Sequence, residues 1–122
     1  MPLRVAMHEL SIIQEVVAAA VEAAEQNEAT RVECVTLRVG ALAGVVKEAL
    51  LFCFDVASKD TLIEGARLEI IELPVRIHCP LCGEDSDLPG IQSFRCPACG
   101  EAGGKILQGR ELELSSMELE TA

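Results

Sequence analysis

Two Cys-x-x-Cys knuckles in one short segment constrain the fold of this chain more than any other feature. The first contains Cys79 and Cys82, and the second contains Cys96 and Cys99. Four thiolates at this spacing can converge on one zinc ion in a closed tetrahedral site, with Zn–S distances of about 2.3 Å. The sequence therefore predicts structural zinc at these four cysteines. Such a site stabilises a fold and has no open position for catalysis.

A glycine follows the second cysteine of each knuckle, at Gly83 and Gly100. Glycine tolerates the positive φ that a tight turn of this kind often needs, so we expect positive φ at both positions. The 13 residues between the knuckles are slightly fewer than the roughly 15–20 usual for such a zinc pattern. The alternatives to zinc at these cysteines are two disulfides or a redox dithiol.

The charge and length of the chain exclude several classes of function. With 122 residues it forms one domain or one domain with a small appendage. Its net charge of −10 disfavours nucleic acid and anionic membrane as partners. No apolar run approaches the roughly 18 residues of a membrane span. Six cysteines without a recognisable secretion signal indicate a reducing compartment, and we expect a soluble cytoplasmic protein.

Five segments have the periodicity of regular secondary structure. Helices are predicted at residues 11–26 and 45–59, and strands at residues 32–39, 66–77 and 111–120.

Local signals refine these segments. Ser11 and Gln14 resemble a capping box at the start of the first helix. Pro74 lacks a backbone donor, so the strand that contains it is expected at a sheet edge. Cys34 and Cys53 lie in apolar segments and are predicted as core residues in preference to metal ligands.

These elements predict an α+β fold, in which two helices pack on a three-stranded sheet and a four-cysteine, zinc-ribbon-like module is inserted. The module, residues 76–107, would form a zinc-binding domain. Residues 1–75 and 108–122 would form the other domain, which carries the helices and the sheet.

The residues available for catalysis are few, and we expect no enzyme. The only histidines are His8 and His78, and no phosphate-binding loop of the Walker type is present. His78 adjoins Cys79, where it would shape the knuckle, bond a thiolate or act as a fifth ligand. His8 lies near a chain terminus, where an amine, backbone nitrogens and an imidazole can chelate nickel(II) or copper(II).

Three motifs together resemble the HypA/HybF family of nickel metallochaperones for [NiFe]-hydrogenase maturation. They are Met7-His8-Glu9-Leu10-Ser11, Phe52-Cys53-Phe54-Asp55 and the paired knuckles, and the resemblance runs from Met7 to about Glu120.

The resemblance implies a nickel-binding α/β domain with an inserted zinc domain. It implies nickel ligation by the amine of Met7, the imidazole and amide of His8, and the amide of Glu9. Nickel would be transient cargo, received from or with a GTPase similar to HypB and delivered to the hydrogenase large-subunit precursor.

The chain departs from the family pattern at its start, because six residues precede Met7. If they are retained, Met7 has no free amine and one expected ligand is lost. We expect Met7 to be the mature N-terminus.

Two alternatives compete with the nickel function. One is a zinc-ribbon module that binds another protein without transferring nickel. Nucleic acid is a poor partner for it, since residues 76–107 hold three bases against four acids. The other is a redox protein with rubredoxin-like iron or a catalytic dithiol. A thioredoxin-type motif should stand where a strand leads into a helix, whereas these knuckles lie among prolines and glycines.

Overall fold

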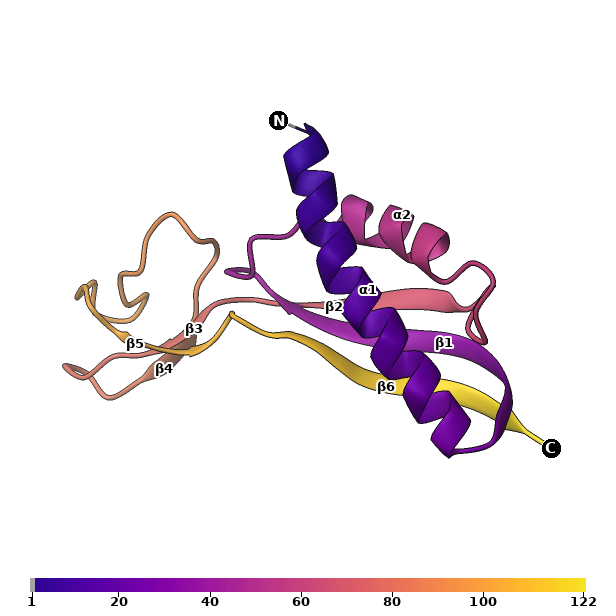
Figure 1. The fold of residues 1–122 in the computed structure, drawn as a ribbon. Helices are drawn as coiled ribbons and strands as arrows, with labels where there is room; N and C mark the ends of the chain where they lie inside the picture. The colour runs from indigo at the N-terminus through magenta and orange to yellow at the C-terminus, as the bar shows by residue number, and fades with distance from the viewer. Residues whose placement is uncertain (1) are drawn as a thin grey trace. The chain divides into compact units, whose positions relative to one another are not determined.

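The computed structural model of the chain describes the backbone of residues 2–122 and the side chains of residues 8–122. Its elements follow one another along the chain as shown in Figure 1. They are α1 (Pro2–Gln26), β1 (Ala29–Gly40), α2 (Lys47–Ala57), β2 (Arg67–Leu73), β3 (Arg76–His78), β4 (Asp85–Asp87), β5 (Lys105–Gln108) and β6 (Leu112–Thr121).

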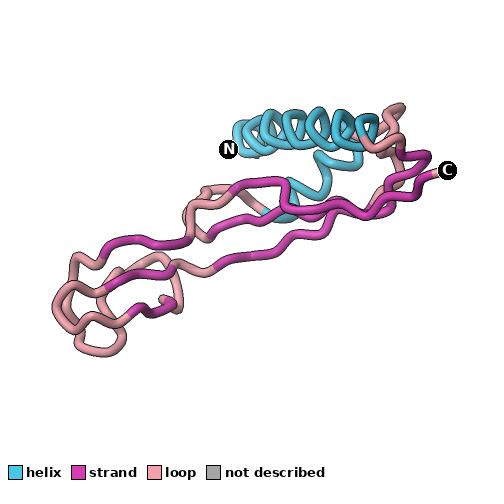
Figure 2. The backbone as a smooth tube through the Cα atoms, turned by 90° about the horizontal axis from the view of Figure 1, so that it is seen from below, coloured by secondary structure: helices cyan, strands magenta, loops and turns pink. Residues whose placement is uncertain are grey.

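A three-stranded sheet with the order β2-β1-β6 carries both helices on one side (Figure 2). The predicted α+β fold, with two helices on a three-stranded sheet and a four-cysteine module, is confirmed. Its core is aliphatic apart from Phe54, because the chain has three phenylalanines and no tryptophan or tyrosine. The largest side chains with almost no exposed surface in this part of the chain are Phe54, Ile13, Leu37, Leu50 and Ile63.

The first helix is longer than predicted. It begins at Pro2 and not at Ser11, so the predicted capping box at Ser11 and Gln14 is wrong: both residues are exposed in the interior of α1. Proline is favoured in the first turn of a helix, where its missing N–H has no intrahelical partner to lose. The predicted end is correct, since Asn27 follows the helix and its side-chain amide donates to the carbonyl of Ala23 at 2.7 Å.

The second predicted helix and the first and last predicted strands are confirmed, with boundaries that differ by one to three residues. In α2 the predicted stripe faces inward, with Leu50 and Phe54 buried and Leu51 and Ala57 half-buried. Cys53 is buried beside them.

The predicted strand over residues 66–77 is correct as far as Leu73, but its continuity is wrong, because Pro74 and Val75 divide it into β2 and β3. Proline cannot donate to a strand ladder. The carbonyl of Val75 instead accepts a hydrogen bond from the amide of Leu88 at 2.7 Å. β3 belongs to a second three-stranded sheet with the order β4-β3-β5.

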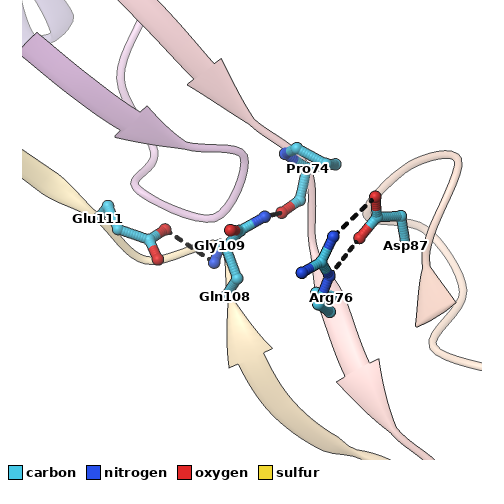
Figure 3. Close-up of polar contacts among 6 residues, drawn as sticks. All are labelled: Pro74, Arg76, Asp87, Gln108, Gly109 and Glu111. Carbon is cyan, nitrogen blue, oxygen red and sulfur yellow. Dashed lines mark hydrogen bonds and ion pairs between the residues drawn. The ribbon is translucent and has the colours of Figure 1, made fainter. Parts of the chain in front are cut away.

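Side-chain hydrogen bonds join the segments that enter and leave the cysteine module, and also connect β3 to β4 (Figure 3). The side-chain amide of Gln108 donates to the carbonyl of Pro74 at 3.0 Å. Arg76 Nε donates to Asp87 Oδ1 at 2.7 Å, between paired positions of β3 and β4. The hydrogen bond with Arg76 holds the pKa of Asp87 below its ordinary value.

The chain divides into two compact units. One comprises Met1–Leu37, Val45–Ile70 and Glu113–Ala122, and the other comprises Arg38–Gly44 and Ile71–Leu112. The second unit has a small core of its own, formed by Val75, Ile77 and Leu88 with Leu42, Phe94 and Ile106 packed against them. Within the part of the chain that the structure describes, no helix has the length and apolar character needed to cross a membrane.

Candidate metal centres

The two cysteine knuckles have the same backbone geometry. In the first, the amide of Gly83 donates to the carbonyl of Cys79 at 2.8 Å, and the amide of Cys79 donates to the carbonyl of Glu84 at 2.9 Å. The second knuckle repeats both bonds at the same distances, from Gly100 to Cys96 and from Cys96 to Glu101. These bonds fix each turn so that both of its sulfurs face the other knuckle.

Positive φ at the two knuckle glycines is confirmed. The φ angles are 76° at Gly83 and 80° at Gly100. A side chain at either position would be strained, because L-residues rarely adopt this conformation. The glycines therefore set the turn that directs the thiols.

The four thiols converge to distances suited to one metal ion. All four sulfur atoms lie within 4.8 Å of one another. The Sγ atoms of Cys79 and Cys99 are 3.5 Å apart, and those of Cys82 and Cys96 are 3.7 Å apart. A tetrahedral zinc site with Zn–S of about 2.3 Å has sulfur–sulfur edges of about 3.8 Å. The arrangement therefore fits tetrathiolate zinc.

The four thiols affect one another's protonation. A backbone hydrogen bond from Cys82 is the main cause that lowers the pKa of Cys79 to about 7. The backbone amide of Glu101 lowers the pKa of Cys99, but the hydrogen bond with the Cys79 sulfur and the partial desolvation of the Cys99 thiol outweigh this. Together they raise the pKa of Cys99 to about 12. Like charges this close cannot all ionise without compensation, so four thiolates require a bound cation.

In the described part of the chain, the imidazole of His78 contacts a carboxylate and not a thiol. Its Nδ1 lies 2.7 Å from Oδ1 of Asp85, its paired residue on β4. Among the described side chains, the group able to hold a metal ion consists of the four cysteines and does not include His78. The structure thus gives His78 a contact beside the strand that enters the first knuckle. Of the alternatives left open for His78, a bond to a thiolate is not found among the described side chains.

The predicted nickel residues lie on α1. Met7 lies outside the residues whose side chains the structure describes. The side chain of His8 is exposed. The amides of His8 and Glu9 lie beyond the first turn of the helix, where an amide donates to the carbonyl four residues earlier. Coordination through these amide nitrogens would therefore require the first turns of α1 to unwind.

Sequence reasoning missed the structural role of the Glu9 side chain, which has no exposed surface. Its Oε2 accepts a hydrogen bond from the amide of Val46 at 2.6 Å, and its Oε1 has no partner among the described residues. A buried unpartnered polar atom costs about 1–3 kcal/mol. Glu9 stands four residues before Ile13, the first residue of the predicted apolar stripe, so its spacing could have indicated burial.

The remaining cysteines are core residues, as predicted. Cys34 is buried in β1, and its Sγ lies 3.6 Å from Oε2 of Glu69. Burial raises the pKa of Cys34 and also that of Cys53. The nearby charge of Glu9 raises the pKa of Cys53 further. Neither thiol belongs to the cysteine group that could hold a metal ion.

The sequence matches one protein family over nearly its whole length. The family model described as "Hydrogenase/urease nickel incorporation, metallochaperone, hypA" covers residues 7–119. A hydrogenase maturation factor HypA from Roseiflexus sp. (strain RS-1) is 51% identical over 114 residues, which are 93% of each chain. The same factor from Geobacter metallireducens is 44% identical over 115 residues, covering 93% of this chain and 100% of the relative.

Solved structures agree with the sequence comparisons. The solution structure of a HypA protein superposes with a TM-score of 0.70 at 26% identity, over 95% of this chain and 98% of the other. The Ni metallochaperone HypA from Helicobacter pylori gives a TM-score of 0.64 at 23% identity, over 93% and 98%. The latter supports the fold alone.

The description of the family is that of metallochaperones and maturation factors, in contrast to catalytic enzymes. The family match begins at Met7, the first residue of the predicted nickel motif, and includes all four clustered cysteines. On this match and on these identities, the chain belongs to the HypA family of hydrogenase and urease nickel-incorporation metallochaperones.

Proposed function

We propose that this protein binds Ni(II) as transient cargo and delivers it to the precursor of a [NiFe]-hydrogenase large subunit, without catalysing a reaction itself. The observation that carries this proposal is the family match over residues 7–119. It includes the Met7-His8-Glu9 motif, most of both units and the cysteine cluster, so each part that such a chaperone needs lies inside the matched region.

Nickel would be bound at the start of α1 by the amine of Met7, the imidazole and amide of His8, and the amide of Glu9. The exposure of the His8 side chain supports this site, because a metal that is handed over must be reached by the receiving protein. Nitrogen donors in a tetragonal arrangement suit nickel(II). In a chain that begins at Met7, the amides of His8 and Glu9 are among the first four of the helix and have no intrahelical partner, so amide ligation breaks no helical hydrogen bond. In a chain that begins at Met1, the turns before Glu9 would have to unwind.

Zinc would be bound by Cys79, Cys82, Cys96 and Cys99. We assign residues 76–107 as a zinc-binding domain and residues 1–75 and 108–122 as the nickel-binding domain. The zinc-binding segment has only a small apolar core, so a closed metal site would contribute much of its folding free energy.

The partners we propose are a GTPase similar to HypB and the hydrogenase large-subunit precursor, in the cytoplasm. The net charge of −10 favours partners with a basic contact surface and would speed their association at low salt.

A second candidate is a zinc-ribbon module that binds another protein and transfers no nickel. The observation that favours it is the exposure of three apolar side chains in the cysteine module, Leu81 at 69%, Ile91 at 51% and Leu107 at 45%. Exposed aliphatic side chains on a small rigid module suit a protein contact.

A nickel(II) titration by calorimetry on zinc-loaded protein separates these two functions. The protein would be prepared in two forms, beginning at Met1 and at Met7, each with a His8→Ala variant. We expect tight one-to-one binding by the form that begins at Met7, lost on His8→Ala with the fold intact. Binding equal in the variant and its parent would place nickel elsewhere, and no binding in either form would favour the interaction module.

A further inference from the structure

Glu9 occupies a position that an apolar residue would fill at lower cost. It lies on the buried stripe of α1, four residues before Ile13, and neither side chain has exposed surface. Apart from Ser58, it is the only polar or charged residue in the buried set of the described side chains. A buried carboxylate is unfavourable unless it is bonded, so its presence here points to the group that it binds.

That group is the beginning of α2. Val46 precedes the first residue of α2 and has no side-chain cap, and its amide donates to Oε2 of Glu9 at 2.6 Å. The N-terminal amides of a helix lack intrahelical partners and carry partial positive charge, so a carboxylate there is favourable. The charge of Glu9 also acts on Cys53 in α2. One side chain of α1 thus interacts with two places on the neighbouring helix.

We propose that the Glu9 carboxylate is a positioning group that anchors the nickel motif to the start of α2, so that nickel binding and the Glu9–Val46 contact strengthen each other. This inference rests on the proposed function. It concerns the side chain of Glu9, whereas the proposed nickel ligand of the same residue is its backbone nitrogen.

The anchor limits the part of the chain that must rearrange when nickel binds. Ligation through the amides of His8 and Glu9 changes the backbone conformation of the residues on the N-terminal side of Glu9. A side chain fixed to α2 holds the residue at that boundary in place, so the ligands rearrange about a fixed point while Ile13 and the rest of α1 stay packed. Without the anchor, the ordering of the motif would have to be achieved during metal binding, which lowers affinity.

Thermodynamic linkage makes the coupling between nickel binding and the Glu9–Val46 contact reciprocal. If the contact raises nickel affinity about tenfold, bound nickel must favour the contact by the same factor of about ten. We therefore expect hydrogen exchange of the Val46 amide, measured by NMR, to slow by about tenfold when nickel saturates the site. The amide of Gly83, which donates to Cys79 in the first knuckle, should be unchanged and reports that zinc is undisturbed.

Three variants test the anchor, in whichever form of the zinc-loaded chain binds nickel in the titration above. Glu9→Gln keeps an oxygen that can accept from Val46, so it should keep nickel affinity within about threefold and keep the exchange response. Glu9→Ala should weaken nickel binding about tenfold, or about 1.4 kcal/mol, and abolish the response. Ile13→Val loosens the same stripe without touching Val46, so it should lower stability and leave both readouts unchanged.

The outcomes distinguish this inference from the function on which it rests. Nickel binding that needs His8 but is equally tight in Glu9→Ala, with Val46 exchange unaffected by nickel, would overturn the anchor and leave the chaperone function standing. A wild-type chain that binds no nickel would overturn both. If Glu9→Ala does not fold, the response of the Val46 amide in wild type and in Glu9→Gln still decides.

Discussion

Replacing Gly40 with alanine gives a direct test of how the chain is held at the end of β1. An ideal Cβ at Gly40 would lie 2.1 Å from the carbonyl oxygen of Gly109 and 2.7 Å from the amide nitrogen of Arg110. Both contacts are with backbone, so no side-chain rotation can relieve them. The two segments must therefore separate.

The separation breaks identifiable bonds. The amide of Gly40 donates to the carbonyl of Glu111 at 2.7 Å, and the amide of Leu42 donates to the carbonyl of Gly109 at 2.7 Å. Each lost bond costs about 0.5–1.5 kcal/mol, and the strain of overpacking costs a further 1–3 kcal/mol or so. Alanine also restricts the unfolded chain more than glycine does, and this stabilises the folded protein by only about 0.4–1 kcal/mol. We expect Gly40→Ala to lower the free energy of unfolding by about 2–4 kcal/mol.

Urea denaturation of the zinc-loaded protein measures this change, with Gly90→Ala as the control. A Cβ at Gly90 meets nothing within 4 Å, so that variant should stay within about 0.5 kcal/mol of wild type. A Gly40→Ala protein as stable as the Gly90→Ala protein would show that the close approach of Gly40 and Gly109 does not exist in solution.

Three further predictions follow from the described side chains. Cys96→Ala should lose zinc and unfold at a lower temperature, whereas Cys34→Ala should keep its zinc, as read by metal analysis and calorimetry; equal zinc content in the two variants would contradict the four-cysteine site. Zinc affinity should rise with pH, because binding must remove the proton of Cys99, whose pKa is raised to about 12 in the metal-free cluster; a pH-independent affinity in a competition assay with a chelator would be inconsistent with this. Phe54→Ala should cost about 3–5 kcal/mol because the ring is buried, while Phe52→Ala, on the exposed side of the same helix, should cost less than about 0.5 kcal/mol in urea melts.

The parts of the fold that sequence predicted are those set by local periodicity. The apolar spacing from Ile13 to Ala24 correctly gave the buried side of α1, and the stripe of α2 was predicted with Leu50 and Phe54 inside. The knuckles gave the convergence of four sulfurs, because glycine turns and cysteine spacing act within a few residues. The identity of the bound metal stays a prediction.

The parts that sequence missed depend on contacts between distant segments. A single strand was predicted across Pro74, because apolar residues continue on both sides of it. The carbonyl of Val75 instead accepts a hydrogen bond from the amide of Leu88, and a local sequence pattern does not reveal this contact. The strands β4 and β5 are only three and four residues long, too short for a periodic pattern, and form by pairing with β3. Burial of Glu9 likewise depends on Val46, 37 positions away.

The two proposed metal sites differ in what holds their ligands, and this difference bears on why one ion would be kept and the other released. Backbone hydrogen bonds in both knuckles fix four sulfurs around a closed tetrahedral position, so an incoming ligand finds no open place on the metal. His8 is exposed and lies near the N-terminal end of a helix. A receiving protein could therefore add a ligand to nickel there before the chaperone's own ligands leave. Stepwise replacement of ligands is thus available at the start of α1 and blocked at the knuckles, and we infer that cargo exchange is confined to the helix.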